Sequence, residues 1–473
     1  MDDSEEQEIC FCSAVELSRR SRSGEISAME ILEIFFDRIR RINPTLNAIV
    51  SIDEEQAYAT ARKLDTIPLG SRGLLHGIPI AVKDLVATRG LRTTMGSLIY
   101  QKYYPDTDEL FVSRLKTAGA VIFGKTNTPE FGAGSQTFNE VFGPTVNPYD
   151  LKKTCGGSSG GAAAALAARL LPLADGSDLG GSLRNPASFC NVVGFWPSPG
   201  RVPFWPKKPI DDGLAVYGPM ARSTEDTAYL LANMAGPDQR VPNSLMEPGS
   251  NFLKSLARSF AGARLALSVD LGMYEVDPRV AHIVHKSADV FTSLGLSVDE
   301  SSPELTGADE TFQTLRAWNF SVLMKEDYFT HRQSMKESLI WNIEKGLRLT
   351  EVEVNRAEKQ KEALVARVYD FFNHYDFLVC PSAQVPPFDV TEEWVQSING
   401  IKMKTYLDWM GICYAITLTG LPAISVPAGF TEEGLPIGIQ IVGGRWDDWG
   451  VLQLAHAFEQ ETEFAKRAPS FAT

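Results

Sequence analysis

The sequence predicts an α/β fold built around one β-sheet that helices largely cover. Three observations support this prediction. Short apolar runs typical of buried strands alternate along the chain with stretches of helical periodicity. Hydrophobic residues make up 44% of the 473 residues, enough for a large core. Residues 237–262 are the best linker candidate, but strand patterns lie on both sides of them. We therefore expect one domain rather than two.

We divide this expected single domain, 1–473, into three parts. Residues 1–70 form a helical N-terminal portion, about 71–235 form the core, and 236–473 complete the same sheet. In the first part, Ser13 and Ser27 are each followed three residues later by glutamate, the capping-box pattern of a helix N-terminus. After Ser27, apolar residues recur at helical spacing, and Asn43–Pro44 is expected to end that helix.

The remaining elements follow from short apolar runs, caps and turn residues. Buried strands are expected at 78–83, 121–123, 265–269, 377–380, 423–426 and 437–442, and 171–174 is a short apolar run before the loop that carries Ser182. Helices are expected at 160–171, which is mostly alanine, and at 278–295, 350–372 and 447–459. Asp277–Pro278 supplies both an N-cap and a first-turn proline to the second of these helices.

Charge and cysteine content exclude several classes of function. The net charge of −14, without a long basic stretch, argues against a nucleic-acid partner. The six cysteines form no CxxC pair, which argues against a zinc site or a disulfide framework and fits a cytoplasmic setting. The acidic N-terminus lacks the features of a signal peptide, and the apolar run 161–173 is too short to span a membrane. We expect no metal, no cofactor and no membrane contact.

A lysine and two serines offer the parts of an acyl-transfer site. Lys83 ends an apolar strand, where burial would favour the neutral amine and so make it a base. The alternative is an exposed lysine at the strand end. Ser158 and Ser159 lie between two glycine pairs, which allow close backbone approach to a substrate. The alternatives there are a plain flexible turn or an anion-binding loop, although the phosphate-loop pattern is absent.

The segment 179–182 places consecutive backbone N–H groups beside Ser182. Such groups can stabilise a developing oxyanion, although a tight turn is the plainer interpretation. Other hydrolase patterns fit less well. No Gly-x-Ser-x-Gly elbow followed by Asp and His is evident. His282 and His285 lie on an expected helix without the acidic partner pattern of a zinc site.

Residues 156–184 join the glycine–serine loop, an alanine-rich helix and the pattern Asp-x-Gly-Gly-Ser-x-Arg. This stretch resembles the signature region of the amidase signature family. The spacing of Lys83, Ser158 and Ser182 is similar to that of the family's Ser–cisSer–Lys triad. Further family-like segments at 124–131, 141–144, 218–222 and 438–440 extend the resemblance over nearly the whole chain.

The resemblance implies an amidohydrolase with a mixed sheet covered by helices on both faces. Ser182 would be the nucleophile, Ser158 would relay its proton to Lys83, and the Gly157–Ser158 peptide would be cis. The oxyanion hole would consist of the N–H groups of Leu179, Gly180, Gly181 and Ser182. The loop would be supported by Gly157, Ser159, Asp178 and Arg184. The substrate would be a small-molecule amide cleaved through an acyl-enzyme, with ester or carbamate cleavage as a side activity.

Two alternatives stay open: the glutamine-hydrolysing component of a tRNA-dependent amidotransferase, and a non-catalytic scaffold of the same fold. A homodimer is also left open. Eight apolar or aromatic residues would favour an apolar or aromatic substrate if they line the pocket rather than the core. They are Met95, Tyr100, Trp318, Phe320, Met403, Tyr406, Trp409 and Met410. Cys155 and Trp196 depart from the family, which usually has proline and often lysine at these positions. A thiol beside the site suggests sensitivity to thiol reagents.

Overall fold

The computed structural model describes residues 3–206 and 213–470. Its centre is an eight-stranded mixed sheet with the strand order β10-β9-β11-β15-β14-β7-β8-β6. The three strands β10, β9 and β11 run parallel, and the pairings from β11 through to β6 are antiparallel. The strands are β6 (Leu173–Asp178), β7 (Val193–Trp196), β8 (Val216–Ala221), β9 (Arg264–Leu267), β10 (Ser297–Glu300), β11 (Phe377–Pro381), β14 (Ala423–Phe430) and β15 (Pro436–Gly443).

A smaller sheet lies beside the β6 edge of the large one. It contains β1 (Ile49–Ile52), β3 (Val121–Thr126) and β2 (Pro79–Lys83), in that order. At the end of β2, the Lys83 N–H donates to the carboxylate of Asp175 in β6, at 3.1 Å. The Asp175 carboxylate therefore accepts a hydrogen bond that a backbone carbonyl would accept if the two sheets formed one continuous ladder. Two short hairpins complete the strands: β4 (Val146–Asn147) with β5 (Asp150–Thr154), and β12 (Ser397–Ile398) with β13 (Ile401–Lys402).

Helices cover both faces of the large sheet, and the strand side chains alternate between them. In β11, Phe377 and Val379 join the core beneath one set of helices, while Leu378 and Cys380 join the core on the other side. The first face is covered by α8 (Thr224–Met234), α9 (Pro278–Ser293) and α15 (Asp448–Thr462). The second is covered by α6 (Gly160–Ala167), α7 (Arg184–Phe189) and α14 (Gly411–Thr419).

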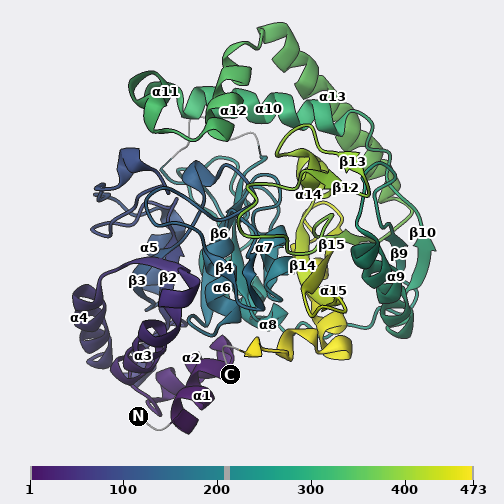
Figure 1. Cartoon of the computed structure of the whole chain (residues 1–473). Coiled ribbons are helices and arrows are strands. Elements are labelled where there is room, and N and C mark those ends of the chain that lie inside the picture. The colour runs from purple at the N-terminus through teal and green to yellow at the C-terminus, as the bar shows by residue number, and fades with distance from the viewer. Residues whose placement is uncertain (1–2, 207–212, 471–473) are drawn as a thin grey trace.

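The remaining helices lie at two opposite ends of the molecule (Figure 1). An arc across the top of the view contains α10 (Ala308–Leu323), α11 (Lys325–His331), α12 (Glu337–Leu347) and α13 (Glu351–Phe371). The N-terminal helices at the bottom and left are α1 (Asp3–Phe11), α2 (Ala14–Ser23), α3 (Ala28–Leu46) and α4 (Glu54–Asp65), and α5 (Leu110–Thr117) lies beside β3. The predicted α/β class with a mixed, helix-covered sheet is confirmed.

Several expected boundaries need correction. The helix α3 continues through Pro44 to Leu46, because the missing N–H removes only one bond in the last turn and Asn47 caps the end in a left-handed conformation. Ser27 forms the full capping box, whereas only half of the box forms at Ser13, where the Glu16 carboxylate binds Arg19 instead. The alanine-rich helix ends at Ala167, earlier than expected.

The linker candidate 237–262 contains only a short 3-10 helix, η4 (Gly249–Leu253), and packs against α8. Across the described residues, no helix has the length and apolar character needed to cross a bilayer.

Candidate active site

The Lys83 side chain is fully buried at the end of β2. Its amine, Nζ, lies 2.7 Å from Ser158 Oγ and 2.8 Å from Ser159 Oγ. It also lies 3.0 Å from Ser177 Oγ, in β6. The alternative of an exposed lysine at the strand end is therefore wrong. The structure joins the predicted lysine to the predicted glycine-flanked serines.

Burial lowers the pKa of Lys83 to about 7, because a charged ammonium is poorly solvated inside the protein. The negative charges of Asp175 and Asp178 act in the opposite direction and raise this pKa. A substantial fraction of the amine is thus neutral near neutral pH. A neutral amine has a lone pair and can accept a proton from a serine hydroxyl.

Asp175 is a part of the site that the sequence did not reveal. It is fully buried in β6 and accepts the backbone N–H of Lys83. Burial raises the pKa of its carboxyl to about 6, against the opposing effects of the Lys83 N–H and the Lys125 ammonium. In the sequence, Asp175 directly follows the short apolar run 171–174, which by itself does not mark it as a site residue.

The serine loop is held by tight packing. The Gly157–Ser158 peptide is cis, as predicted. A Cβ atom added to Gly160 would lie 2.2 Å from Thr137 Oγ1, and one added to Gly161 would lie 2.3 Å from the Asn127 nitrogen. The second glycine pair therefore lets the start of α6 approach its neighbours more closely than any side chain would allow.

Ser182 lies in the turn between β6 and α7 and is half-buried. Its backbone carbonyl accepts the N–H of Ser159 at 3.2 Å, so the two serine loops are in direct contact. Within the described part of the chain, no hydrogen bond joins the hydroxyls of Ser158 and Ser182. Such bonds often form only when substrate is bound.

A buried ion pair braces the turn that carries Ser182. Asp178 accepts the N–H groups of Gly181 (2.6 Å) and Leu183 (2.9 Å), and it also binds the Arg184 guanidinium at 3.1 Å. Both charged side chains are fully buried. Arg184 donates onward to the Cys413 carbonyl in α14 and to Gln440 Oε1 in β15. The turn is thus attached to two elements from the C-terminal part of the chain.

The two glycines before Ser182 are also closely packed. A Cβ atom on Gly180 would lie 2.8 Å from the Phe312 ring in α10. Gly181 has a φ of 126°, and a Cβ there would lie 2.7 Å from Cys413 Cβ in α14. No other residue type fits these positions without displacing a neighbour.

The family model described as Amidase matches residues 30–452 of the chain. An acylamidase of Rhodococcus erythropolis is 35% identical to it over 474 residues, which cover 98% of both proteins. The chain belongs to the amidase signature family. Another relative of this amidase is a component of the glutamyl-tRNA(Gln) amidotransferase of Carboxydothermus hydrogenoformans. It is 34% identical over 489 residues, covering 98% of this chain and 99% of the relative.

Structural similarity supports the same family assignment. The crystal structure of a bacterial aryl acylamidase of the amidase signature family superposes on the chain with a TM-score of 0.90 and 28% identity, covering 96% of this chain and 98% of the other. The expectation of an amidase that hydrolyses amide C–N bonds is confirmed by these comparisons.

A cavity of about 470 Å³ opens beside the lysine cluster of this amidase, at Ser177. Of the eight residues considered for the pocket, Met95 and Tyr100 line it. Trp409 and Met410 belong instead to the buried core behind α14. The other residues that line the cavity are Leu85, Tyr103, Phe131, Phe204, Ala215, Val216, Tyr217, Leu323, Met324 and Asp327.

The two departures from the family pattern lie inside the core. Cys155 is fully buried, and burial raises the pKa of its thiol to about 12. This thiol does not supply the reactive thiolate that thiol reagents need. Trp196 is also fully buried and packs with its ring below the Arg184 guanidinium, at 5.9 Å.

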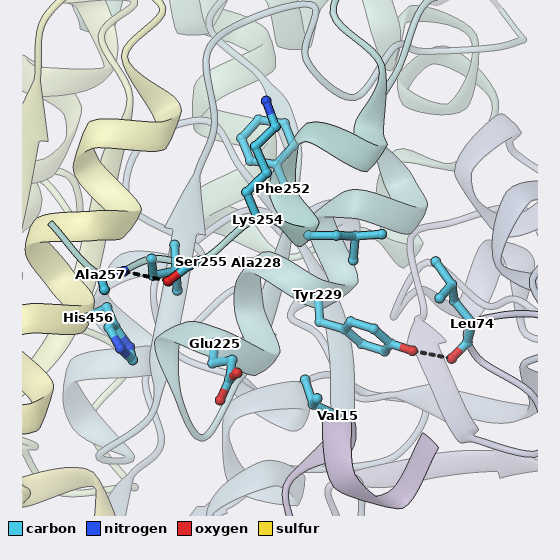
Figure 2. A pocket seen from close by; sticks show the side chains of 12 residues that line it. Val15, Leu74, Glu225, Ala228, Tyr229, Phe252, Lys254, Ser255, Ala257 and His456 are labelled. Carbon is cyan, nitrogen blue, oxygen red and sulfur yellow. Dashed lines mark hydrogen bonds between the residues drawn. The ribbon is translucent and has the colours of Figure 1, made fainter. Parts of the chain in front are cut away.

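A second cavity, of about 500 Å³, lies away from these residues (Figure 2). Its walls come largely from α2, α8, α15 and the segment 252–257, elements that carry none of the predicted site residues. Figure 2 shows the Tyr229 hydroxyl bonded to the Leu74 carbonyl, with Glu225 and His456 on the other side. The cavity beside Ser177 is therefore the one connected to the chemistry.

Proposed function

We propose that this amidase works through a Ser182 acyl-enzyme, with Ser158 and Lys83 as its proton relay. The Ser182 oxygen attacks the amide carbonyl carbon. Its proton passes to Ser158 while the Ser158 proton passes to Lys83 Nζ. The observation that carries the proposal is the 2.7 Å contact between Lys83 Nζ and Ser158 Oγ, inside a site that lowers the lysine pKa to about 7.

The relay then runs in reverse to complete the reaction. The ammonium of Lys83 returns the proton through Ser158 to the leaving nitrogen, and the C–N bond breaks to give an amine or ammonia and a Ser182 ester. Water attacks this ester and gives its proton to the same relay, which releases the carboxylic acid and restores Ser182. Esters and carbamates would follow the same path, because they form the same type of oxyanion.

The oxyanion would be held by the backbone N–H groups of Leu179, Gly180 and Ser182. Gly181, the fourth predicted donor, already gives its N–H to Asp178 at 2.6 Å, so we assign it the weakest part. Each effective donor of this kind is typically worth about 3 kcal/mol in the barrier. The supporting roles of Gly157, Ser159, Asp178 and Arg184 are to hold the two serine loops against each other.

A fluorophosphonate probe tests the nucleophile. We expect it to label the protein, mass spectrometry of the digest to locate the label on Ser182, and Ser182→Ala to abolish labelling. Ser177→Ala is the matched control, because Ser177 also faces the lysine amine and lines the cavity. In the Ser177→Ala protein, the label should remain on Ser182. Absence of labelling in the native chain would contradict the proposal, and is the result that a non-catalytic scaffold predicts.

The second candidate function is that of the glutamine-hydrolysing component of an amidotransferase. The observation in its favour is the full-length similarity to a component of a glutamyl-tRNA(Gln) amidotransferase. A glutaminase assay separates the two candidates. Hydrolysis of anilides or aliphatic amides by the isolated chain, with no glutaminase activity, supports the free-standing amidase. Glutaminase activity that appears only on addition of the other amidotransferase components supports the second candidate.

A further inference from the structure

The cavity beside Ser177 is mostly apolar. Its walls consist of aliphatic, thioether and aromatic side chains, apart from Ser177 itself and the hydroxyls of three tyrosines. Among the residues that line the cavity, one side chain is charged: Asp327, a carboxylate in the first turn of α11. A single charged group in an apolar binding cavity is typically the group that fixes orientation and specificity.

Asp327 has unused capacity for hydrogen bonds. Its two oxygens both lie 3.1 Å from the Tyr100 hydroxyl, which has only one proton to share between them. A carboxylate can accept about four hydrogen bonds. Within residues 3–206 and 213–470, no lysine, arginine or histidine forms an ion pair with Asp327. Its neighbours in the chain, Lys325 and Glu326, are exposed and do not line the cavity.

The ring of Tyr100, which binds this carboxylate, belongs to a group of three aromatic rings. Tyr100 makes edge contacts with Tyr103 and Phe131, at centroid distances of 5.7 and 5.9 Å, and all three rings line the cavity. Burial and the charge of Asp327 together raise the pKa of Tyr100 to about 12, so the ring stays a neutral donor. Aromatic faces attract cations, and a carboxylate pairs with them directly.

We propose that Asp327, with the aromatic group Tyr100, Tyr103 and Phe131, is a specificity site for an ammonium group on the substrate. The preferred substrates are then amides that carry an apolar spacer between the scissile bond and a primary amine. The spacer would occupy the apolar part of the cavity, with the amine at Asp327. This inference rests on the proposed function for the site of cleavage, but the binding it predicts does not require turnover.

Three para-substituted acetanilides test the proposal. They carry an aminomethyl, a hydroxymethyl or a carboxylate group and so differ mainly in charge. A second set of para-substituted phenylacetamides presents the same groups from the acyl side. Dissociation constants are measured by calorimetry on the Ser182→Ala protein, and kcat/KM is measured on the native chain. In one of the two sets, the ammonium compound should bind about tenfold more tightly than its neutral partner, as expected for a charge-assisted hydrogen bond. The carboxylate compound should bind least.

Two variants test whether Asp327 causes the preference for the ammonium compound. Asp327→Asn should reduce the ammonium preference to less than about twofold. Glu326→Gln removes the same charge one residue away, outside the cavity, and should leave the preference intact. Equal binding of ammonium and neutral compounds in both sets would overturn the proposal, as would a preference that survives Asp327→Asn. The comparison of compounds on the unaltered cavity decides the question even if Asp327→Asn does not fold.

The two proposals fail in different ways. If Ser182 is not the nucleophile, Ser182→Ala retains hydrolysis of the neutral anilide, whatever the charge preference. If only the specificity site is wrong, the neutral compound is hydrolysed and labelling of Ser182 persists, but the ammonium preference is absent.

Discussion

At the scale of single residues, the site contains a buried amine whose pKa falls to about 7. Lys83 and its serine partners were predictable because chain order and flanking glycines mark them. Asp175 was not, since sequence alone cannot show that a carboxylate in β6 lies beneath the end of β2. The cavity residue Asp327 was missed for the same reason: it is one acidic residue in a stretch with several, and only the fold places it against Tyr100.

The activity should depend on the protonation of Lys83. Burial lowers its pKa to about 7, and in the proposed mechanism the neutral form is the base. We therefore expect kcat/KM to fall about tenfold per pH unit below pH 7, to rise through neutrality and to level off at higher pH. The measurement is kcat/KM for a neutral anilide from pH 5 to 9. A profile that stays flat down to pH 5 would show that this amine is not the base.

Replacing Asp175 should move that profile. The Asp175→Asn side chain keeps an oxygen for the Lys83 N–H but removes the negative charge that favours the protonated amine. The pKa of Lys83 should decrease, so the acid limb of kcat/KM should shift to lower pH. The nearby Asp178, Asp84 and Lys125 are unchanged, and the surface variant Asp37→Asn serves as control. A lower rate with an unmoved midpoint would mean that Asp175 contributes only to packing.

At the scale of elements, the turn between β6 and α7 is a braced structure. Its two glycines have no room for side chains, and its acidic and basic residues are paired and fully buried. The sequence predicted the order of helices and strands well where caps and apolar runs were clear, as at Thr350 and Asp277. It failed at Pro44, where a local cap lets the helix continue, and at the polar end of β6, where a contact with the distant strand β2 lies.

Breaking the buried ion pair should destabilise the whole protein. Asp178→Asn leaves the Arg184 guanidinium buried without its counter-charge, which typically costs about 3–5 kcal/mol. The quantity to measure is the free energy of unfolding in urea. Asp37→Asn, which removes an exposed pair with Arg40, should cost less than about 1 kcal/mol. Equal losses in the two variants would contradict the bracing role.

At the scale of the whole molecule, the arc of helices α10–α13 is attached to the site through a few polar contacts. Glu130 accepts the Ser97 hydroxyl at 2.7 Å and the Lys336 N–H at 2.8 Å, and the Lys336 ammonium donates to the Ala133 carbonyl. These contacts join the start of α12 to the loop that carries Phe131. The sequence could not predict this arrangement, because the partners lie about 206 residues apart. The single-domain division of the chain stays a prediction.

Loosening this attachment should be visible in backbone dynamics. Glu130→Gln removes the charge and leaves one acceptor oxygen, so the bonds to Ser97 and the Lys336 N–H weaken, at a local cost of about 1 kcal/mol. We expect faster hydrogen exchange in the first turn of α12 and around Ser97, together with a higher KM for anilides. Glu337→Gln, an exposed neighbour in the same turn, should change neither. Unchanged exchange rates in Glu130→Gln would count against the attachment.

The bond from Arg184 to Gln440 spans 256 residues of chain. During synthesis, a ribosome makes the Ser182 turn long before it makes β15, and a domain generally folds as a unit. The growing polypeptide therefore carries Ser182, the proposed nucleophile, on an unfastened turn, and this amidase should gain activity only after translation has passed the last strand. A delay of this kind would protect the amide bonds of the cell from a half-made hydrolase.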